Sequence, residues 1–521
     1  MKRFVGIVRV AEGIAIAAMI AVASAHVGSP NVVFDGAAGP YDVRVVVKPP
    51  AVVPGLADVI VRVSSSDAQS VEHVVIRPVF WRAGVNGAPA GDDAPRVAGQ
   101  GDVYAGQLWL MSRGSYSVYV TVTGARGTGT AIVPVNAFAT GRLGLSRGLA
   151  MILIILGSVL FVGLVTIVRA AAGESLVAPG ERIDASRRRR ANVVAAVFAP
   201  ILALVLFGGA KWWKSVDRDY ARTMFKAPAV DATVAPDRTL RLSLHDTAAF
   251  RALFSAVIPD HGKMMHLFLI KDADMSSFAH LHPVQTDSLG FTTTVPPIPP
   301  GRYRLFGDVT LENGSSLTVT NTIDVATASA QNAAGGPSSG ARDPDDSWSV
   351  DSAHVPVPAL AAGATARLAP SASAPTMRWL GDAGALVANQ PVDLTFDVRN
   401  PDGAAATLQP YLGMTAHAVV MRDDDSVFIH LHPMGTISTA SQQVFVLRDR
   451  GDTTIKGRLH IDSASGPMHA GMSGVSSMND MTTSSKFTIP YEFPKPGRYR
   501  LWVQVKADGR VLTGTFDANV R

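Results

Sequence analysis

Two long stretches without a charged side chain limit how this chain of 521 residues can fold. No charge occurs in the 21 residues that follow Arg147, nor in the 20 residues that follow Arg190. A helix of about 20 apolar residues is long enough to cross the hydrocarbon core of a bilayer. We therefore predict two transmembrane helices, over residues 148–168 and 191–210.

The segment between these two stretches, residues 169–190, is strongly basic. It carries six arginines, four of them in the run Arg187–Arg190, against three acidic residues. Loops on the cytoplasmic side of a membrane are enriched in Lys and Arg. We predict that this loop is cytoplasmic and that the chain on either side of the two helices lies outside.

The first 25 residues have the pattern of a secretory signal peptide. Lys2 and Arg3 precede the apolar stretch Ile14–Val22, and the segment closes on Ala23-Ser24-Ala25. Export of the following domain agrees with the topology deduced from the basic loop. The signal contributes +2 and the loop +3 to the formal net charge of +5, so the exported part is neutral. We therefore expect no nucleic-acid partner.

The exported residues alternate apolar and polar positions in short runs that Gly and Pro separate, which is typical of β-strands. The length corresponds to about three or four domains. We predict a mainly β chain of three β-sandwich, immunoglobulin-like domains (26–145, 211–326 and 353–521) plus a two-helix transmembrane hairpin. Residues 327–352, rich in Ala, Gly, Ser and Asp, read as a linker. The expected strands include Val43–Val47, Val59–Val63, Val74–Pro78, Ser117–Val122, Ala131–Val135, Leu240–Leu244, Met265–Ile270, Tyr303–Val309 and Ser316–Val325.

The second and third domains share an internal repeat. In one, Gly262-Lys-Met-Met-His266 leads to Phe278-Ala-His280-Leu-His282-Pro283. In the other, Gly413-Met-Thr-Ala-His417 leads to Phe428-Ile-His430-Leu-His432-Pro433. Later, Pro300-Gly-Arg-Tyr-Arg-Leu-Phe306 matches Pro496-Gly-Arg-Tyr-Arg-Leu-Trp502. The third domain differs by an insertion, since 63 residues separate His432 from Pro496 where 17 separate His282 from Pro300.

The repeated histidines are placed to converge. Residues two apart on a strand face the same way, so each His-x-His pair shares one face. Asp-rich segments at Lys271–Asp274 and Arg422–Asp425 lie midway between the single His and the pair, where a hairpin should turn. Folding back would bring His266 beside His280 and His282, and His417 beside His430 and His432, at cross-strand distances of about 5 to 7 Å.

Three neutral imidazoles suit Zn, Cu, Fe or Ni. A fourth position could come from Met264, His261 or water in the second domain, and from Met414 in the third. The chain has no cysteine, and thioether ligands favour Cu(I). The insertion adds Met468, His469 and Met472. Copper is therefore our leading ion, with zinc as the alternative.

Cleavage after Ala25 would create a further chelate. His26 would then offer its α-amino group and imidazole, and His73 is the only other histidine of that domain. Tyr303 and Tyr499 resemble the tyrosine corner of immunoglobulin-like sandwiches, in which the hydroxyl anchors backbone. We assign no metal role to three further histidines outside the repeat, His245, His354 and His460.

Several of these segments resemble known families. Met265–Ile270, Phe278–Pro283 and Gly301–Leu305 are similar to the YtkA-like β-sandwich domains of bacterial exported proteins. The opening Gly28–Val32, the paired apolar stretches and Gly413–His417 resemble a broader set of bacterial membrane proteins with this layout. His26 resembles the amino terminus of the CopC copper-resistance sandwich. The resemblance implies the architecture more strongly than any activity.

Together these features predict a binding protein, not a catalyst, anchored in the bacterial cytoplasmic membrane with most of its mass on the periplasmic side. It would bind or deliver copper through two three-histidine sites, with the lipid bilayer and a copper-dependent membrane enzyme or metal exporter as partners. Two alternatives stay open. One is a metalloenzyme with Asp260, Asp272 or Asp308 as general base. The other is a scaffold for a membrane complex that binds no metal.

Overall fold

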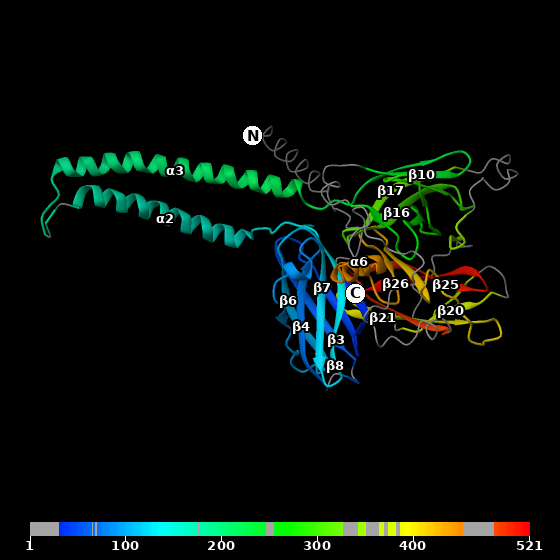
Figure 1. Cartoon of the computed structure of the whole chain (residues 1–521). Coiled ribbons are helices and arrows are strands. Elements are labelled where there is room, and N and C mark those ends of the chain that lie inside the picture. Colours follow the sequence, from blue (N-terminus) through cyan, green and yellow to red (C-terminus); the bar gives the residue numbers. More distant parts are fainter. Residues whose placement is uncertain are drawn as a thin grey trace. The chain divides into compact units, whose positions relative to one another are not determined.

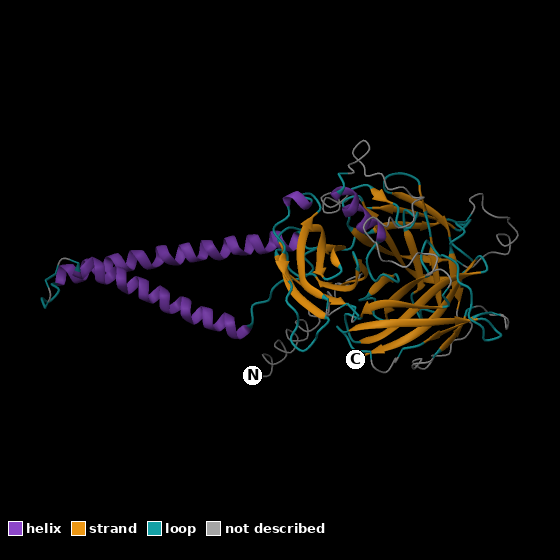
Figure 2. Ribbon diagram, turned by 60° about the horizontal axis from the view of Figure 1, so that its bottom comes forward, coloured by secondary structure: helices purple, strands orange, loops and turns teal. Residues whose placement is uncertain are grey.

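The computed structural model describes residues 31–245, except 65, 68, 69, 176 and 179, and residues 255–326, 342–350, 364–368, 374–381, 386–451 and 484–521. The chain divides into two compact units. One unit, Phe138–Lys226, contains the apolar helices, and the other contains the β domains. Strands dominate the described chain, as Figure 2 shows.

The first domain is a β-sandwich of two antiparallel sheets. One sheet has the order β1(Val32–Ala38), β2(Tyr41–Lys48), β3(Gly55–Val63), β6(Val103–Leu110). The other has the order β5(Asp92–Asp93), β4(Val71–Phe80), β7(Gly114–Gly124), β8(Gly127–Ala137), and a short 3-10 turn, η1(Val85–Gly87), follows β4. Alternate residues of β3, including Val59 and Val61, are fully buried, which is the period-2 pattern of a strand with one face in a core.

The second domain is also two packed sheets. One has the order β14(Val284–Gln285), β15(Gly290–Thr294), β10(Thr239–Leu244), β9(Val230–Val234). The other has the order β11(Val257–Ile258), β16(Gly301–Leu311), β12(His266–Lys271), β13(Ser277–Leu281), β18(Ser347–Val350), with β17(Ser316–Val325) pairing with β16 (Figure 1). β18 comes from the stretch that composition assigned to the linker. Its alternating Ser-Trp-Ser-Val adds an edge strand to β13.

The third domain repeats this plan. Its sheets have the orders β19(Thr365–Arg367), β20(Thr376–Trp379), β21(Pro391–Arg399), β24(Lys486–Glu492) and β23(Phe428–Leu431), β22(Ala416–Arg422), β25(Gly497–Ala507), β26(Arg510–Val520). A helix, α6(Thr439–Asp449), follows β23 and begins at the N-cap Ser438. The predicted fold class is confirmed: a mainly β chain of sandwiches with two long apolar helices.

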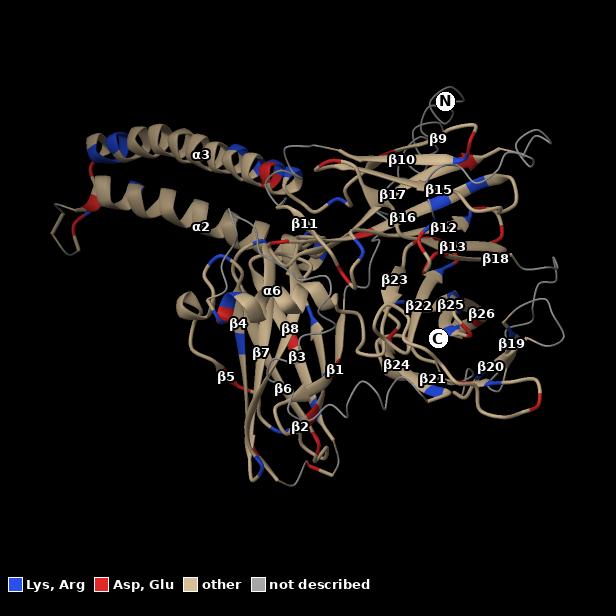
Figure 3. Cartoon of the chain, turned by 45° about the vertical axis from the view of Figure 1, so that its right-hand side comes forward, with Lys and Arg blue, Asp and Glu red and all other residues tan. Residues whose placement is uncertain are grey.

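The two helices are longer than the predicted spans. α2(Arg147–Glu174) and α3(Ala185–Arg222) have mean hydropathies of 2.9 and 2.5 in their most apolar windows, and both are long and apolar enough to cross a membrane. Figure 3 shows their middle parts free of charged side chains, with Lys and Arg near both ends of α3. α3 begins within the basic segment, where the Asp184 side chain caps the helix by accepting from the Arg187 amide.

The expected tyrosine corners are confirmed. Tyr303 Oη donates to the carbonyl of Pro299 at 2.7 Å, and Tyr499 Oη donates to that of Lys495 at 2.7 Å. Both tyrosines are buried, and each is the third residue of its strand, β16 or β25. Each therefore ties the start of a strand to the loop before it, in the same way in both repeats.

The second and third domains pack their His-bearing sheets against each other with pseudo-two-fold symmetry. Phe306 stacks on Phe428 with ring centroids 4.0 Å apart, and the equivalent Trp502 stacks on Phe278 at 5.0 Å. The buried cluster at this interface consists of four equivalent pairs, which are Phe268 and Val419, Ile270 and Met421, Phe278 and Phe428, and Phe306 and Trp502.

The rim of this interface follows the same symmetry. Arg304 pairs with Asp425 of the third domain, and the equivalent Arg500 donates to the carbonyl of Met275 in the second at 3.1 Å. Each arginine thus contacts the hairpin turn of the opposite repeat. The interface fixes how the two His-bearing faces meet.

We predict that Phe428→Ala lowers the free energy of unfolding by about 3 to 5 kcal/mol, because it removes a fully buried aromatic ring that stacks across the interface. Urea titration of the full chain in detergent, followed by tryptophan fluorescence, measures this. Met111→Ala is the control, since Met111 is 62% exposed, and it should change stability by less than about 0.5 kcal/mol. Equal effects of the two substitutions would contradict the interface.

Candidate metal centre

Seven histidine side chains gather where the two repeats face each other. In the second domain, His266 is the first residue of β12, His280 lies on β13, and His282 directly follows β13. In the third domain, His417 is the second residue of β22, His430 lies on β23, and His432 directly follows β23. His261 lies on the turn before β12. Neighbouring rings in this set have centroids between 4.5 and 6.2 Å apart. The seven members, which we call the histidine cluster, are His261, His266, His280, His282, His417, His430 and His432.

Strand register explains why the rings share a face. β12 pairs with β13 so that Leu267 lies opposite Leu281 and Phe268 opposite His280. His266, two residues before Phe268, therefore points to the same side as His280 and His282. β22 and β23 have the equivalent register, with Val419 opposite His430. The spacing of 14 residues in one repeat and 13 in the other is absorbed in the hairpin turn.

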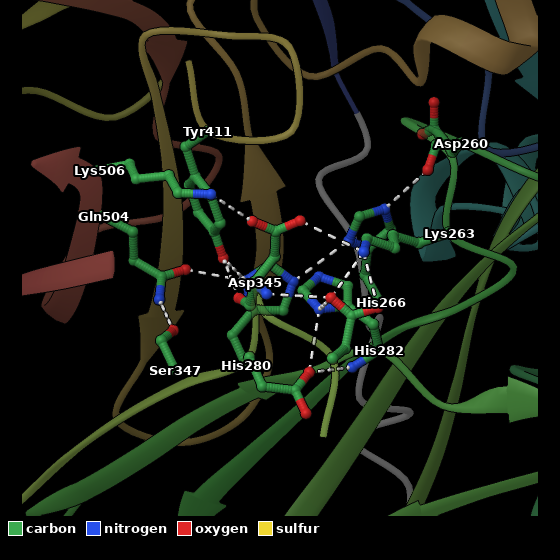
Figure 4. Close-up of polar contacts among 12 residues, drawn as sticks. Asp260, Lys263, His266, His280, His282, Asp345, Ser347, Tyr411, Gln504 and Lys506 are labelled. Carbon is green, nitrogen blue, oxygen red and sulfur yellow. Dashed lines mark hydrogen bonds and ion pairs between the residues drawn. The ribbon is translucent and has the colours of Figure 1, made fainter. Parts of the chain in front are cut away.

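The first group is His266, His280 and His282, the triad expected for the second domain. One ring nitrogen of each lies within 4.8 Å of the others. His266 Nδ1 is 3.2 Å from His280 Nε2. His282 Nδ1 is 3.1 Å from Asp346 Oδ1. Figure 4 shows the three histidines of this group together.

Polar partners hold the two closest rings of this group. His266 Nε2 donates to the backbone carbonyl of Asp260 at 3.2 Å, which leaves His266 Nδ1 as a lone-pair atom. His280 Nδ1 lies 2.9 Å from Gln504 Oε1 and 3.1 Å from Tyr411 Oη. The 3.2 Å contact between His266 Nδ1 and His280 Nε2 is a hydrogen bond when Nε2 carries the proton of His280, and a pair of metal donors when Nδ1 carries it.

The second group combines two histidines of the third domain with one of the second. Ring nitrogens of His417, His432 and His261 lie within 4.8 Å of one another. The rings of the expected triad, His417, His430 and His432, gather with centroids 4.5 to 5.3 Å apart. The ring of His430 also lies 5.2 Å from His266 and 5.5 Å from His280 in the other repeat. His261 joins this group because the repeats face each other, which sequence spacing within one repeat does not encode.

Several buried ring nitrogens have no hydrogen-bond partner among the described residues. Burying an unpaired polar atom costs about 1 to 3 kcal/mol, and such atoms in native proteins commonly mark a bound ion or water. His282 and His432 each donate from Nδ1, to Asp346 and to the carbonyl of Ile437, which leaves Nε2 as the lone-pair atom. The unpaired atoms are His282 Nε2, His417 Nδ1, His417 Nε2, His430 Nε2 and His432 Nε2.

Burial keeps five of these rings neutral. It is the largest cause lowering the pKa of His266, His280, His417 and His430 well below the ordinary value, and the neighbouring rings lower these pKa values further. Burial also lowers the pKa of His432 to about 3. Neutral imidazole has a free lone pair, which is the form that binds metals. These five rings are therefore able to accept a ligand at physiological pH.

An acidic segment that composition assigned to the linker lies beside the first group. His282, Asp343 and Asp346 form a further set with ligand atoms within 4.8 Å. Lys263 Nζ pairs with Asp343 at 2.6 Å, and Lys506 Nζ pairs with Asp345 at 2.9 Å (Figure 4). The sequence signal was Asp343-Pro-Asp-Asp346, four residues with three carboxylates just before β18.

The candidate methionines do not occupy equivalent places. Reciprocal backbone hydrogen bonds close the turn from Asp260 to Lys263 at 2.9 Å, and the turn from Tyr411 to Met414 at 2.7 and 3.0 Å. These turns are equivalent, so Met414 occupies the position of Lys263, and Met264 occupies that of Thr415. The two candidate thioethers therefore stand one position apart in the two repeats.

The remaining histidines and candidate methionines are either undescribed or on the surface. His26, Met468, His469 and Met472 are outside the described residues, as are His354 and His460. His73 pairs with Asp93 at 3.0 Å and His245 pairs with Asp231 at 2.7 Å, each on an exposed surface.

The three carboxylates considered as general bases differ in environment. Asp272 lies on the β12–β13 turn and pairs with Arg304. Asp260 Oδ1 accepts from the Ala440 amide at 3.0 Å. Asp308 Oδ2 lies 3.7 Å from His430 Nδ1, and burial raises the pKa of this carboxyl to about 7. Among these, Asp308 is the carboxylate that a reaction at the cluster could use as a base.

A family model described as "Domain of unknown function (DUF8832)" matches residues 222–327 and 374–521. The match covers a little under half of the chain. It includes every member of the histidine cluster and leaves out the first domain and most of the helical unit. No curated protein matches the chain.

Solved structures of tandem domains align at low similarity. The FN1–FN3 domains of chicken CNTN1 align with 94% of this chain and 99% of their own length, at 8% identity and a TM-score of 0.14. A tetra-tandem repeat from the extending region of a large adhesion protein aligns with 90% of this chain and 96% of its own length, at 8% identity and a TM-score of 0.15. These scores carry no argument about what this chain does.

We predict that the metal-free protein loses stability as the pH falls below about 6.5. The folded rings resist protonation while the unfolded chain binds protons at about pH 6.5, so each ring costs up to about 1.4 kcal/mol per pH unit in that range. Urea titrations of EDTA-treated full chain at pH 7.5, 6.5 and 5.5 measure the slope.

His417→Phe should reduce this slope, because it removes a ring with two unpaired nitrogens and keeps an aromatic side chain. His245→Gln, at an exposed position, should leave the slope unchanged. A slope that is identical in the wild type and His417→Phe would show that the buried rings do not govern it.

Proposed function

We propose that this protein is a membrane-anchored metal-binding protein that holds ions in the histidine cluster between its second and third domains. The observation that carries the proposal is the set of buried ring nitrogens without a hydrogen-bond partner that surrounds His266 Nδ1 and His280 Nε2, which lie 3.2 Å apart. Two ligands on a tetrahedral ion with bonds of about 2.0 Å would lie about 3.3 Å apart. The separation therefore suits two imidazoles that share one ion.

The donor set favours a borderline metal ion. Imidazole nitrogen suits Cu, Zn, Fe and Ni, and hard ions such as Mg²⁺ or Ca²⁺ prefer oxygen. Copper remains the leading ion, because the chain offers Met and His in the insertion and has no cysteine. Zinc is the alternative, especially at the first group, where Asp346 holds the His282 ring. The YtkA-like and CopC-like resemblance agrees with copper.

We further propose that α2 and α3 anchor the protein in the bacterial cytoplasmic membrane, with the basic loop inside and the β domains outside. Their length and hydropathy support a crossing, and the arginines around the loop support its orientation. In this location the bound ion would be available to a copper-dependent membrane enzyme or a metal exporter.

Because the chain has no cysteine, single substitutions test the orientation directly. A membrane-impermeant maleimide should label Ala98→Cys and Ala404→Cys in cells whose outer membrane has been opened. It should label Glu181→Cys only after the inner membrane is permeabilised. Labelling of Glu181→Cys from outside would reverse the proposed topology.

The full chain, purified in detergent after growth with copper, should retain the metal in elemental analysis by mass spectrometry. His280→Ala combined with His282→Ala should lose at least one equivalent of copper per chain, since it removes two donors of the first group. His73→Ala combined with His245→Ala is the matched control and should retain the wild-type content.

A wild-type chain that contains no metal, and whose melting temperature is unchanged by Cu(I), Cu(II) or Zn(II), would favour the scaffold alternative. Turnover of a substrate by the wild type, with the ion retained, would favour the metalloenzyme. In that case Asp308→Asn should abolish the turnover and leave the metal content unchanged.

A further inference from the structure

The pseudo-two-fold symmetry of the cluster breaks at one turn. The turns Asp260–Lys263 and Tyr411–Met414 have the same backbone, with φ of 52° and 79° at His261 and Gly262, and of 51° and 78° at Leu412 and Gly413. The position that carries an imidazole in the second domain therefore carries an aliphatic side chain in the third. The two metal-binding groups cannot be chemically equivalent.

The unmatched histidine points across the interface. The ring centroid of His261 lies 5.1 Å from His432 and 5.5 Å from His417, both in the third domain, but 6.2 Å from His266 in its own domain. Its side chain is only 4% exposed. His261 thus completes a set whose other members belong to the opposite repeat.

The third domain holds this histidine in place. Thr439 Oγ1 lies 3.4 Å from His261 Nε2, and the Ala440 amide donates to Asp260 Oδ1 at 3.0 Å. Both residues belong to the first turn of α6, which the repeat in the second domain lacks. The helix therefore fixes the turn that presents His261 to His417 and His432.

The two groups also differ in charge. The first group has carboxylates beside it, Asp346 and Asp343, within 3.1 and 3.9 Å of His282 Nδ1. The second group has one carboxylate beside it, Asp260, whose Oδ1 lies 3.7 Å from His261 Nε2. In a buried site, nearby carboxylates offset the charge of a divalent ion, so the site with fewer of them favours a monovalent ion more.

We propose that the cluster binds two ions at inequivalent sites, and that His261, His417 and His432 hold the second ion jointly across the domain interface. This rests on the proposed metal-binding function and specifies it. The first site, His266, His280 and His282 with the nearby carboxylates, prefers Zn(II) or Cu(II). The second site, with three imidazole donors and the single carboxylate of Asp260 nearby, prefers Cu(I). An ion in the second site links the second domain to the third.

The repeat itself supplies the test variant. His261→Leu installs the residue that the equivalent turn already carries at φ 51°. His261→Asn, measured in parallel, keeps a residue suited to positive φ. The full chain in detergent is titrated with Cu(I) against a coloured chelator and, separately, with Zn(II), and bound metal is counted by elemental mass spectrometry.

Wild type should bind two equivalents of Cu(I), and both His261 variants should bind one. Zn(II) binding at the first site should be unchanged in the His261 variants and lost in His282→Ala combined with Asp346→Asn. His245→Asn, an exposed control, should match the wild type in both titrations.

The possible failures are distinct. If the wild type binds no metal, the proposed function itself fails. If it binds metal but the His261 variants keep the wild-type Cu(I) stoichiometry, the proposed function stands and the shared second site is overturned. If the His261 variants lose both equivalents of Cu(I) together with Zn(II), the cluster is a single centre and the two-site proposal is overturned.

Discussion

The contact between the two repeats determines the chemistry of this protein. Stacked aromatic rings bury the interface, and the same strands that carry those rings carry the histidines two residues further along. The nitrogens of a buried imidazole need a hydrogen-bond partner or a bound ligand. The interface therefore makes these histidines buried, closely spaced nitrogen donors.

The partners of these donors also come from the opposite repeat. His280 Nδ1 contacts Gln504 of the third domain, and the equivalent His430 faces the equivalent Asp308 of the second. Each repeat thus orients a ring that the other repeat carries. The replacement of an amide by a carboxyl at these matched places is a second difference between the two halves, in addition to the pair His261 and Leu412.

Sequence reasoning predicted the β-sandwich class, the two apolar helices and the tyrosine corners, because each depends on local periodicity or on a short motif. It also predicted that His266, His280 and His282 share a face, since strand alternation alone decides that. It could not predict that His261 would join His417 and His432, or that the ring of His430 would also approach those of His266 and His280. These depend on how two sheets dock, and docking follows from side-chain packing far apart in the sequence. The acidic residues before β18 escaped attention because the composition around them is that of a linker.

Joining the two repeats in one polypeptide has a consequence for how the centre can change over evolutionary time. In an assembly of two identical subunits, a substitution near the axis appears twice and alters both sides together. Here each side mutates by itself, so one turn can acquire an imidazole while its counterpart keeps leucine. Covalent fusion thereby permits two unlike groups of side chains within an almost symmetrical frame.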